Sequence, residues 1–210
     1  MKTTSTTEKS PTHDLTWSLT FPTDGGEEPR LELEYAVKAL EELYISDRLW
    51  DGDVVHTRSP DPYGVYRFVQ NGSLRLVFAQ APYPPNVHLG NLYRPLYSRI
   101  RAGETRRQKV TVKLPVVEYS ALERDVDANA ALEEVSRVFL VIGYRLRKTM
   151  DKDPEPPSRE SAESAGYVVY APEHIILELP VDKIPVKRRT GYIARFPLPG
   201  EPGPGPMPLP

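Results

Sequence analysis

Hydrophobic and polar positions alternate most regularly near the start of the chain, in the segment LTWSLTF at residues 15–21. Leu15, Trp17 and Leu19 alternate there with threonine and serine, and this period of two is typical of a half-buried strand. Residues 1–14 are polar and show no apolar period. We therefore expect a disordered N-terminal segment followed by a strand.

The pattern changes to steps of three and four between residues 30 and 49. Leu33, Val37, Leu40 and Tyr44 follow these steps, which predicts an amphipathic helix. A second pattern of this kind covers residues 127–147 and predicts a second helix. The segment RVFLVIGYRL inside it is rich in β-branched residues and also fits a buried strand, but its spacing favours the helix.

Several other segments predict strands and loops. Two apolar runs flank Asn71-Gly72 within residues 64–81, the sequence pair that a type I′ hairpin turn favours. Further strands are expected at 107–120, 166–172, 173–184 and 190–198. Residues 81–97, rich in proline and tyrosine, and the acidic, proline-broken residues 150–165 are expected to form loops.

This order of elements predicts an α+β fold, in which two helices pack on an antiparallel or mixed sheet. With 210 residues, the chain is expected to form one domain over residues 15–197, with a flexible loop at 150–165. Residues 1–14 would be disordered, and residues 198–210 would form a Pro/Gly-rich tail of the polyproline type. The chain has no cysteine and no apolar run of membrane-spanning length, and it starts without an apolar leader. We therefore expect a cytoplasmic protein that does not cross a membrane.

Charge alternates in blocks along the chain. The net charge is −7 over residues 1–61, +8 over 62–113, −7 over 114–182 and +4 over 183–210. The most basic stretch, LYRPLYSRIRAGETRRQKVTVK at 92–113, contains a single acidic residue, Glu104. Blocks of opposite sign indicate complementary surfaces that meet either within one fold or between copies.

Two functions compete for the basic segments 92–113 and 183–196. Arginine binds phosphate through two hydrogen bonds and tyrosine stacks on bases, so these segments could bind a nucleic-acid strand. Arginine and tyrosine are also enriched at protein interfaces, and we favour contact between the basic segment of one copy and an acidic face, which includes Glu32 and Glu34, of another. The candidates for either role are Tyr93, Arg94, Tyr97, Arg99, Arg101, Arg106, Arg107, Lys109, Lys187, Arg188 and Arg189, with Glu41 and Glu42 on the acidic face.

No catalytic residue, cofactor site or metal site is predicted. Asp47, Asp51, Asp53, His56 and Asp61 offer oxygen and nitrogen ligands, but such a cluster after a predicted helix is typical of a solvated turn. The spacing does not match a calcium loop, and no nucleophile elbow or phosphate-binding loop occurs. An enzyme of unknown reaction is therefore the third-ranked possibility.

The order of these elements over residues 30–196 resembles that of phage tail-terminator and tail-completion proteins. The resemblance rests on element order alone, and the acidic loop 150–165 and the proline-rich tail depart from it. It implies a non-enzymatic structural protein that assembles into a ring in the phage tail or injection system, so that it would be located in the virion. Its partners would be copies of itself and other assembly subunits, with no cofactor or small-molecule substrate.

Overall fold

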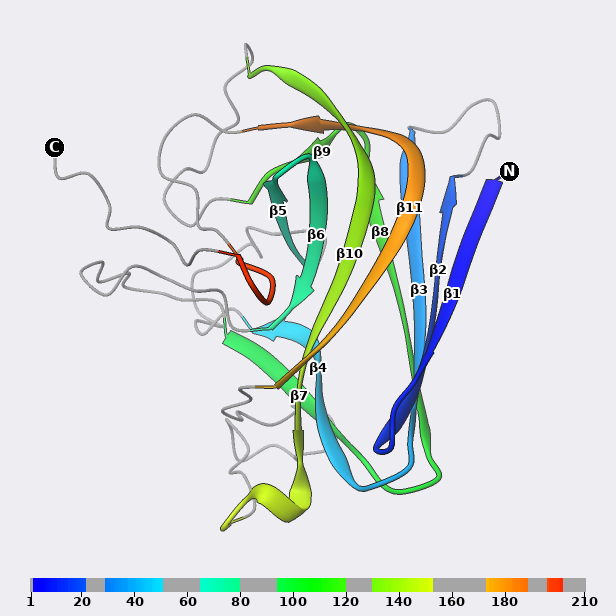
Figure 1. Ribbon diagram of the computed structural model, residues 1–210, viewed down its shortest axis with the longest axis vertical. Coiled ribbons are helices and arrows are strands. Elements are labelled where there is room, and N and C mark those ends of the chain that lie inside the picture. Colours follow the sequence, from blue (N-terminus) through cyan, green and yellow to red (C-terminus); the bar gives the residue numbers. More distant parts are fainter. Residues whose placement is uncertain are drawn as a thin grey trace, which may run out of the picture.

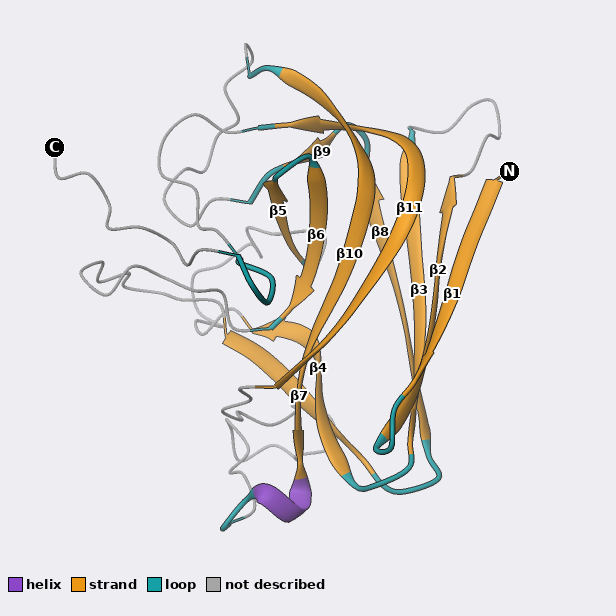
Figure 2. Ribbon diagram, viewed as in Figure 1, coloured by secondary structure: helices purple, strands orange, loops and turns teal. Residues whose placement is uncertain are grey.

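The computed structural model describes residues 2–21, 29–50, 65–79, 94–119, 130–152, 173–188 and 196–201. Nearly all regular structure in these ranges is β-strand (Figure 2). The strands, labelled in Figure 1, are β1 (Lys2–Lys9), β2 (His13–Phe21), β3 (Arg30–Ala39), β4 (Leu43–Trp50), β5 (Tyr66–Gln70), β6 (Ser73–Phe78), β7 (Arg94–Ile100), β8 (Thr105–Lys113), β9 (Val116–Val117), β10 (Leu132–Leu146) and β11 (Glu173–Lys187). A single turn of 3-10 helix at Arg147–Thr149 follows β10.

The first sheet has four antiparallel strands in the order β1, β2, β3, β8. Alternate residues of its strands are buried, because one face lies on the core and the other faces solvent. In the register of the sheet, Leu33 in the middle of β3 stands opposite Leu19 on β2 and Val110 on β8. The outer face carries threonine, serine and charged side chains.

The second sheet has seven strands. Five lie in the order β5, β6, β10, β11, β9, and β4 joins this sheet by pairing with both β10 and β7. The β6–β10 and β9–β11 pairs are parallel, and the other pairs are antiparallel. The long strand β10 therefore lies in the middle of the sheet, where Figure 1 shows it beside β11.

The main hydrophobic core lies between the two sheets. Trp17 and Leu33 of the first sheet belong to the same buried cluster as Leu76 and Leu140 of the second. The other face of the second sheet carries a separate buried cluster, in which Phe196, from beyond the last strand, packs with residues of β5, β6 and β10. The second sheet is thus covered on both faces.

The predicted α+β fold is wrong, since both predicted helices are strands. Residues 30–49 form β3, a turn and β4. Leu33 and Val37 are four residues apart, so they share a face in a strand as well as in a helix. Leu31 and Tyr35, which the helical pattern leaves out, are buried beside them, and Leu40 lies in the turn with 43% of its surface exposed.

The second predicted helix fails for a related reason. Residues 132–146 form β10, so the alternative of a buried strand is the one that the structure contains. A β-bulge between Val135 and Arg137 puts Val135 and Val138, three residues apart, in the same buried cluster. Residues 138–143 are then buried on both faces, so no polar residues interrupt the run and a period of two is hidden.

The N-terminal segment is also ordered, contrary to the expectation of disorder over residues 1–14, because residues 2–9 form β1. The strand at 15–21 and the hairpin around Asn71-Gly72 are confirmed; both turn residues have positive φ, 50° and 68°, as a type I′ turn requires. The strand at 173–184 is confirmed as part of β11. The strand predicted at 166–172 lies outside the described residues.

Within the ranges described, no helix is long and apolar enough to cross a bilayer.

Candidate interaction surface

The basic stretch 92–113 is divided between the two sheets. β7 pairs with β4 in the second sheet, whereas β8 pairs with β3 in the first. The turn between them contains Gly103, whose φ of 88° suits glycine. The cations of this stretch therefore belong to two different sheets and do not form one continuous basic surface.

Most of these cations are paired with carboxylates of the same chain. Arg99 forms an ion pair with Glu42 at 2.5 Å, and Arg101 contacts Glu104 at 3.7 Å. Glu41, the other predicted acidic contact, binds Lys148 at 2.5 Å. The opposite charges that the sequence places in separate blocks thus meet within one fold.

Arg106 makes the most buried of these ion pairs. Its Nε donates to Oδ2 of Asp47 at 2.8 Å, and the hydroxyl of Ser98 donates to the same oxygen at 2.8 Å. Asp47 has no exposed surface and lies in a bulge of β4, which turns its side chain toward the interior. The side-chain amide of Gln108 also donates to the Asp47 carbonyl at 3.2 Å. This pair joins β8 of the first sheet to β4 of the second.

Lys109 is held on the outer face of the first sheet. Its amino group lies 3.0 Å from a carboxylate oxygen of Glu32 and 3.6 Å from one of Glu34. The hydrogen bond to Glu32 raises the pKa of Lys109, and the same bond lowers the pKa of Glu32. Both acids belong to β3, the strand that pairs with β8.

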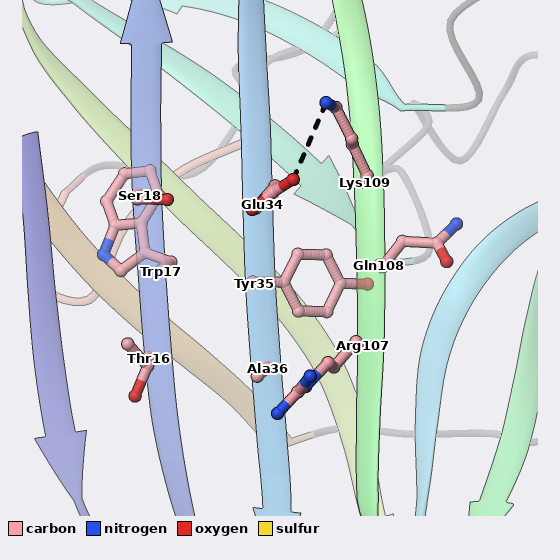
Figure 3. A pocket seen from close by; sticks show the side chains of 9 residues that line it. All are labelled: Thr16, Trp17, Ser18, Glu34, Tyr35, Ala36, Arg107, Gln108 and Lys109. Carbon is pink, nitrogen blue, oxygen red and sulfur yellow. Dashed lines mark ion pairs between the residues drawn. The ribbon is translucent and has the colours of Figure 1, made fainter. Parts of the chain in front are cut away.

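A shallow hollow of about 630 Å³ opens on this outer face (Figure 3). The small side chains of Thr16 and Ser18 line its β2 side and Ala36 lies on β3, with Arg107 toward one end and the Glu34–Lys109 pair toward the other. Arg107 is exposed and has no carboxylate partner in the described part of the chain. Among the β8 cations whose partners the structure describes, Arg107 is thus the one on this face that can bind an anion from outside the chain.

Two predicted contact residues have other surroundings. Tyr97 is only 1% exposed and packs with Tyr44, and burial raises its pKa. It therefore cannot stack on a base. Arg188 is half-buried, 3.7 Å from Glu133 and 3.9 Å from the buried carboxylate of Glu118.

The remaining candidates are placed less fully. Lys187 ends β11 and is half-buried. Arg94 begins β7, but its side chain lies outside the described residues, as do Tyr93 and Arg189. Of the possible ligands near Asp47 that were interpreted as part of a solvated turn, Asp51, Asp53, His56 and Asp61 also lie outside them. Within the described ranges, no three His, Asp or Glu side chains are grouped so as to hold a metal ion.

A second buried ion pair was not predicted from the sequence. Arg75, on β6, is 1% exposed, and one of its terminal nitrogens lies 2.7 Å from Glu201. The guanidinium also donates to the Phe196 carbonyl and, at 3.0 Å, to Gln70. These bonds attach the start of the predicted C-terminal tail to the second sheet. The only signal in the sequence is that Glu201 is the single acidic residue after Asp182.

The outer face of β1 and β2 forms a regular ladder of hydroxyl side chains, which we call the threonine–serine ladder. Thr3, Ser5 and Thr7 of β1 face outward and stand opposite Thr20, Ser18 and Thr16 of β2, in that order. The Thr3 and Thr20 hydroxyls are 3.1 Å apart. The signal in the sequence is the repeat Thr-x-Ser-x-Thr, which occurs at 3–7 and again at 16–20.

No protein-family model matches this chain, and no curated protein or solved structure matches it either.

Proposed function

We propose that this protein is a non-enzymatic assembly protein, a β-sandwich that associates with copies of itself and with other protein subunits. The observation that carries the proposal is that most cations of the basic stretch are already bound by carboxylates of the same chain. Arg99, Arg106 and Lys109 each have an acidic partner within 3.0 Å. A nucleic-acid strand would have to displace these partners before these three cations could contact phosphate.

The same pairing changes how copies would meet. Contact between the basic stretch of one copy and the acidic face of another would compete with bonds that each copy makes internally. We therefore expect association through neutral surfaces and backbone groups, with little dependence on salt. The likeness to ring-forming phage tail proteins stays a prediction. It was based on an order of elements with two predicted helices, and both of these segments are strands in the structure. A cytoplasmic location before assembly is part of this proposal.

The test is the molar mass of the protein by light scattering at low and high salt, with and without a single-stranded oligonucleotide. We expect a mass above that of the 23.7 kDa chain, retained at high salt and unchanged by the oligonucleotide. A monomer that binds the oligonucleotide, and loses binding as salt rises, would favour the nucleic-acid alternative.

The exposed Arg107 separates the two outcomes further. If the hollow binds phosphate, Arg107→Glu should weaken oligonucleotide binding and reduce its dependence on salt. Lys152→Glu is the matched control, because it makes the same change of charge at an exposed position away from the hollow. Under the proposal, neither variant changes the mass of the assembly.

A further inference from the structure

β1 is an edge strand with a regular backbone. Among the described strands it pairs only with β2, and the register runs without a bulge from Lys2 opposite Phe21 to Lys9 opposite Asp14. Figure 1 shows it at the outer margin of the first sheet. In the described structure no strand pairs with β1 on the side away from β2, although part of β1 lies close to β11, and the backbone groups on this side can accept another strand.

The middle residues of β1 do not protect this edge. Natural edge strands are commonly blocked by lysine, proline or a bulge. Residues 3–7 of β1 are Thr-Thr-Ser-Thr-Thr, without charge or proline, and threonine favours strands. The opposite edge of the same sheet, β8, differs because its exposed positions include Arg107, Lys109 and Lys113. β8 thus carries cations along its length, whereas the charged residues of β1, Lys2, Glu8 and Lys9, lie only at its two ends.

The order of side chains along β1 is nearly symmetric about Ser5. If two copies of β1 pair antiparallel with Ser5 opposite itself, Thr3 stands opposite Thr7 and Thr4 opposite Thr6. The same register sets Lys2 of each copy opposite Glu8 of the other, which pairs opposite charges. In a two-fold symmetric antiparallel pair, one residue must stand opposite its own copy. Any register between two such positions would set an outward-facing residue opposite an inward-facing one, whereas paired residues share a face of the sheet. The next such register, centred on Thr6, sets Thr4 opposite Glu8 and leaves Lys2 unopposed.

The surroundings of Glu8 favour a cation arriving from outside. One of its carboxylate oxygens is buried and has no hydrogen-bond partner in the described structure, and the same is true of Glu173. Burial, and then the carboxylates of Glu173 and Glu8, raise the pKa of Tyr144. A buried carboxylate oxygen without a partner is costly, and an opposing cation would reduce that cost.

We infer that a second copy of this chain pairs antiparallel along the free edge of β1, with the two-fold axis at Ser5. The two four-stranded sheets then form one continuous sheet, and the threonine–serine ladder extends across four neighbouring strands. Threonine–threonine pairs on adjacent strands stabilise a sheet through side-chain hydrogen bonds and methyl packing. This inference rests on the proposed self-association and names the surface that would perform it.

The first test uses the absence of cysteine from the chain. Opposed residues in an antiparallel pair have Cα atoms about 4.5–5.5 Å apart, which a disulfide can span. Ser5→Cys should therefore form a covalent dimer under mild oxidation. Ser18→Cys, also outward-facing but one strand farther from the edge, is the matched control and should not. Equal cross-linking of both variants, or none in either, would overturn the inference.

The second test reverses the interaction at the exposed positions Thr3 and Thr7. Thr3→Lys with Thr7→Lys puts like charges opposite each other in the proposed register. The contact between the two β1 strands should then break, and the molar mass of the assembly should fall. Thr3→Lys with Thr7→Glu puts opposite charges there and should retain the wild-type mass. Circular dichroism checks that both variants fold.

The outcomes separate this inference from the proposed function. An oligomeric wild type whose mass survives both double substitutions would overturn the β1 interface but leave self-association in place. A wild type that is monomeric at every concentration, with Ser5→Cys forming no dimer, would overturn both.

Discussion

Two buried ion pairs join parts of the chain that are far apart in the sequence. Asp47 binds Arg106 between the sheets, and Arg75 binds Glu201 on the far face of the second sheet. Asp47 and Arg75 are almost completely buried. When Arg106 or Glu201 is removed, its partner is left as an uncompensated buried charge, at a cost of about 3–5 kcal/mol. These residues therefore stabilise the arrangement of segments around them.

Glu201 is expected to make stability depend on pH. The hydrogen bond from Arg75, in the first place, lowers the pKa of Glu201 from 4.5 to about 2. A carboxylate whose pKa is lower in the folded state stabilises it above the unfolded pKa, and this contribution is lost as pH falls from about 4.5 to about 2. Glu201→Gln should lower the melting temperature at neutral pH, and its difference from wild type should shrink through that range. A difference that is constant with pH would contradict this role.

Because residues 30–49 form two strands and a turn, two of their leucines should respond differently to substitution. Leu33→Asp buries a charge between the sheets and should unfold the protein, because such burial costs several kcal/mol. Leu40→Asp, which the helical pattern would make equally harmful, lies in an exposed turn and should change the midpoint of urea unfolding little. Unfolding by Leu40→Asp would instead support the helix.

At the scale of elements, the segment 196–201 acts as a cover for the second sheet. Phe196 stacks on Phe68 with ring centres 6.3 Å apart, and its ring meets that of His174 edge-on at 5.4 Å. Leu198 packs against the same cluster, and its backbone N–H donates to Glu201 at 2.9 Å. The start of the predicted tail is thus part of the folded unit.

Truncation tests this cover. A chain that ends after residue 195 lacks Phe196 and Glu201, so it exposes an apolar cluster and leaves Arg75 without its carboxylate partner. We expect a clear fall in melting temperature by calorimetry. A chain that ends after Glu201 keeps all of these contacts and is the matched control. Equal melting temperatures for the two truncated chains would mean that the cover contributes nothing.

At the scale of the whole molecule, the two sheets share one core and should unfold together. Trp17 of β2 and Leu140 of β10 lie in the same cluster, although their strands belong to different sheets. In a β-sandwich this interface supplies most of the buried apolar area, so neither sheet is expected to be stable alone.

A core substitution in one sheet should therefore be detected in the other. Leu140→Ala is expected to cost about 2–5 kcal/mol. The loss should appear as a lower denaturant midpoint in the fluorescence of Trp17, measured with Trp50→Phe as background, and at the same midpoint in circular dichroism. Separate midpoints would indicate that the sheets unfold independently.

The sequence by itself determined the elements whose pattern is local. The strand at 15–21 alternates because one face is solvated, and the hairpin follows from Asn71-Gly72, whose backbone preferences are set by those two residues alone. The charge blocks also predicted complementary surfaces, and the structure contains such contacts within the chain, as Arg99 and Glu42 show. For the strand and the hairpin, neighbouring residues carry enough information.

Only the tertiary structure decided the rest. A spacing of four residues, as between Leu33 and Val37, suits a helix and a strand equally, so the choice depended on whether a second sheet was available to cover one face. In β10 the decision came from burial on both faces and from the bulge after Val135. That the polar residues of β1 form a strand depends on its pairing with β2. A polar segment forms a strand when a neighbouring strand accepts its backbone hydrogen bonds.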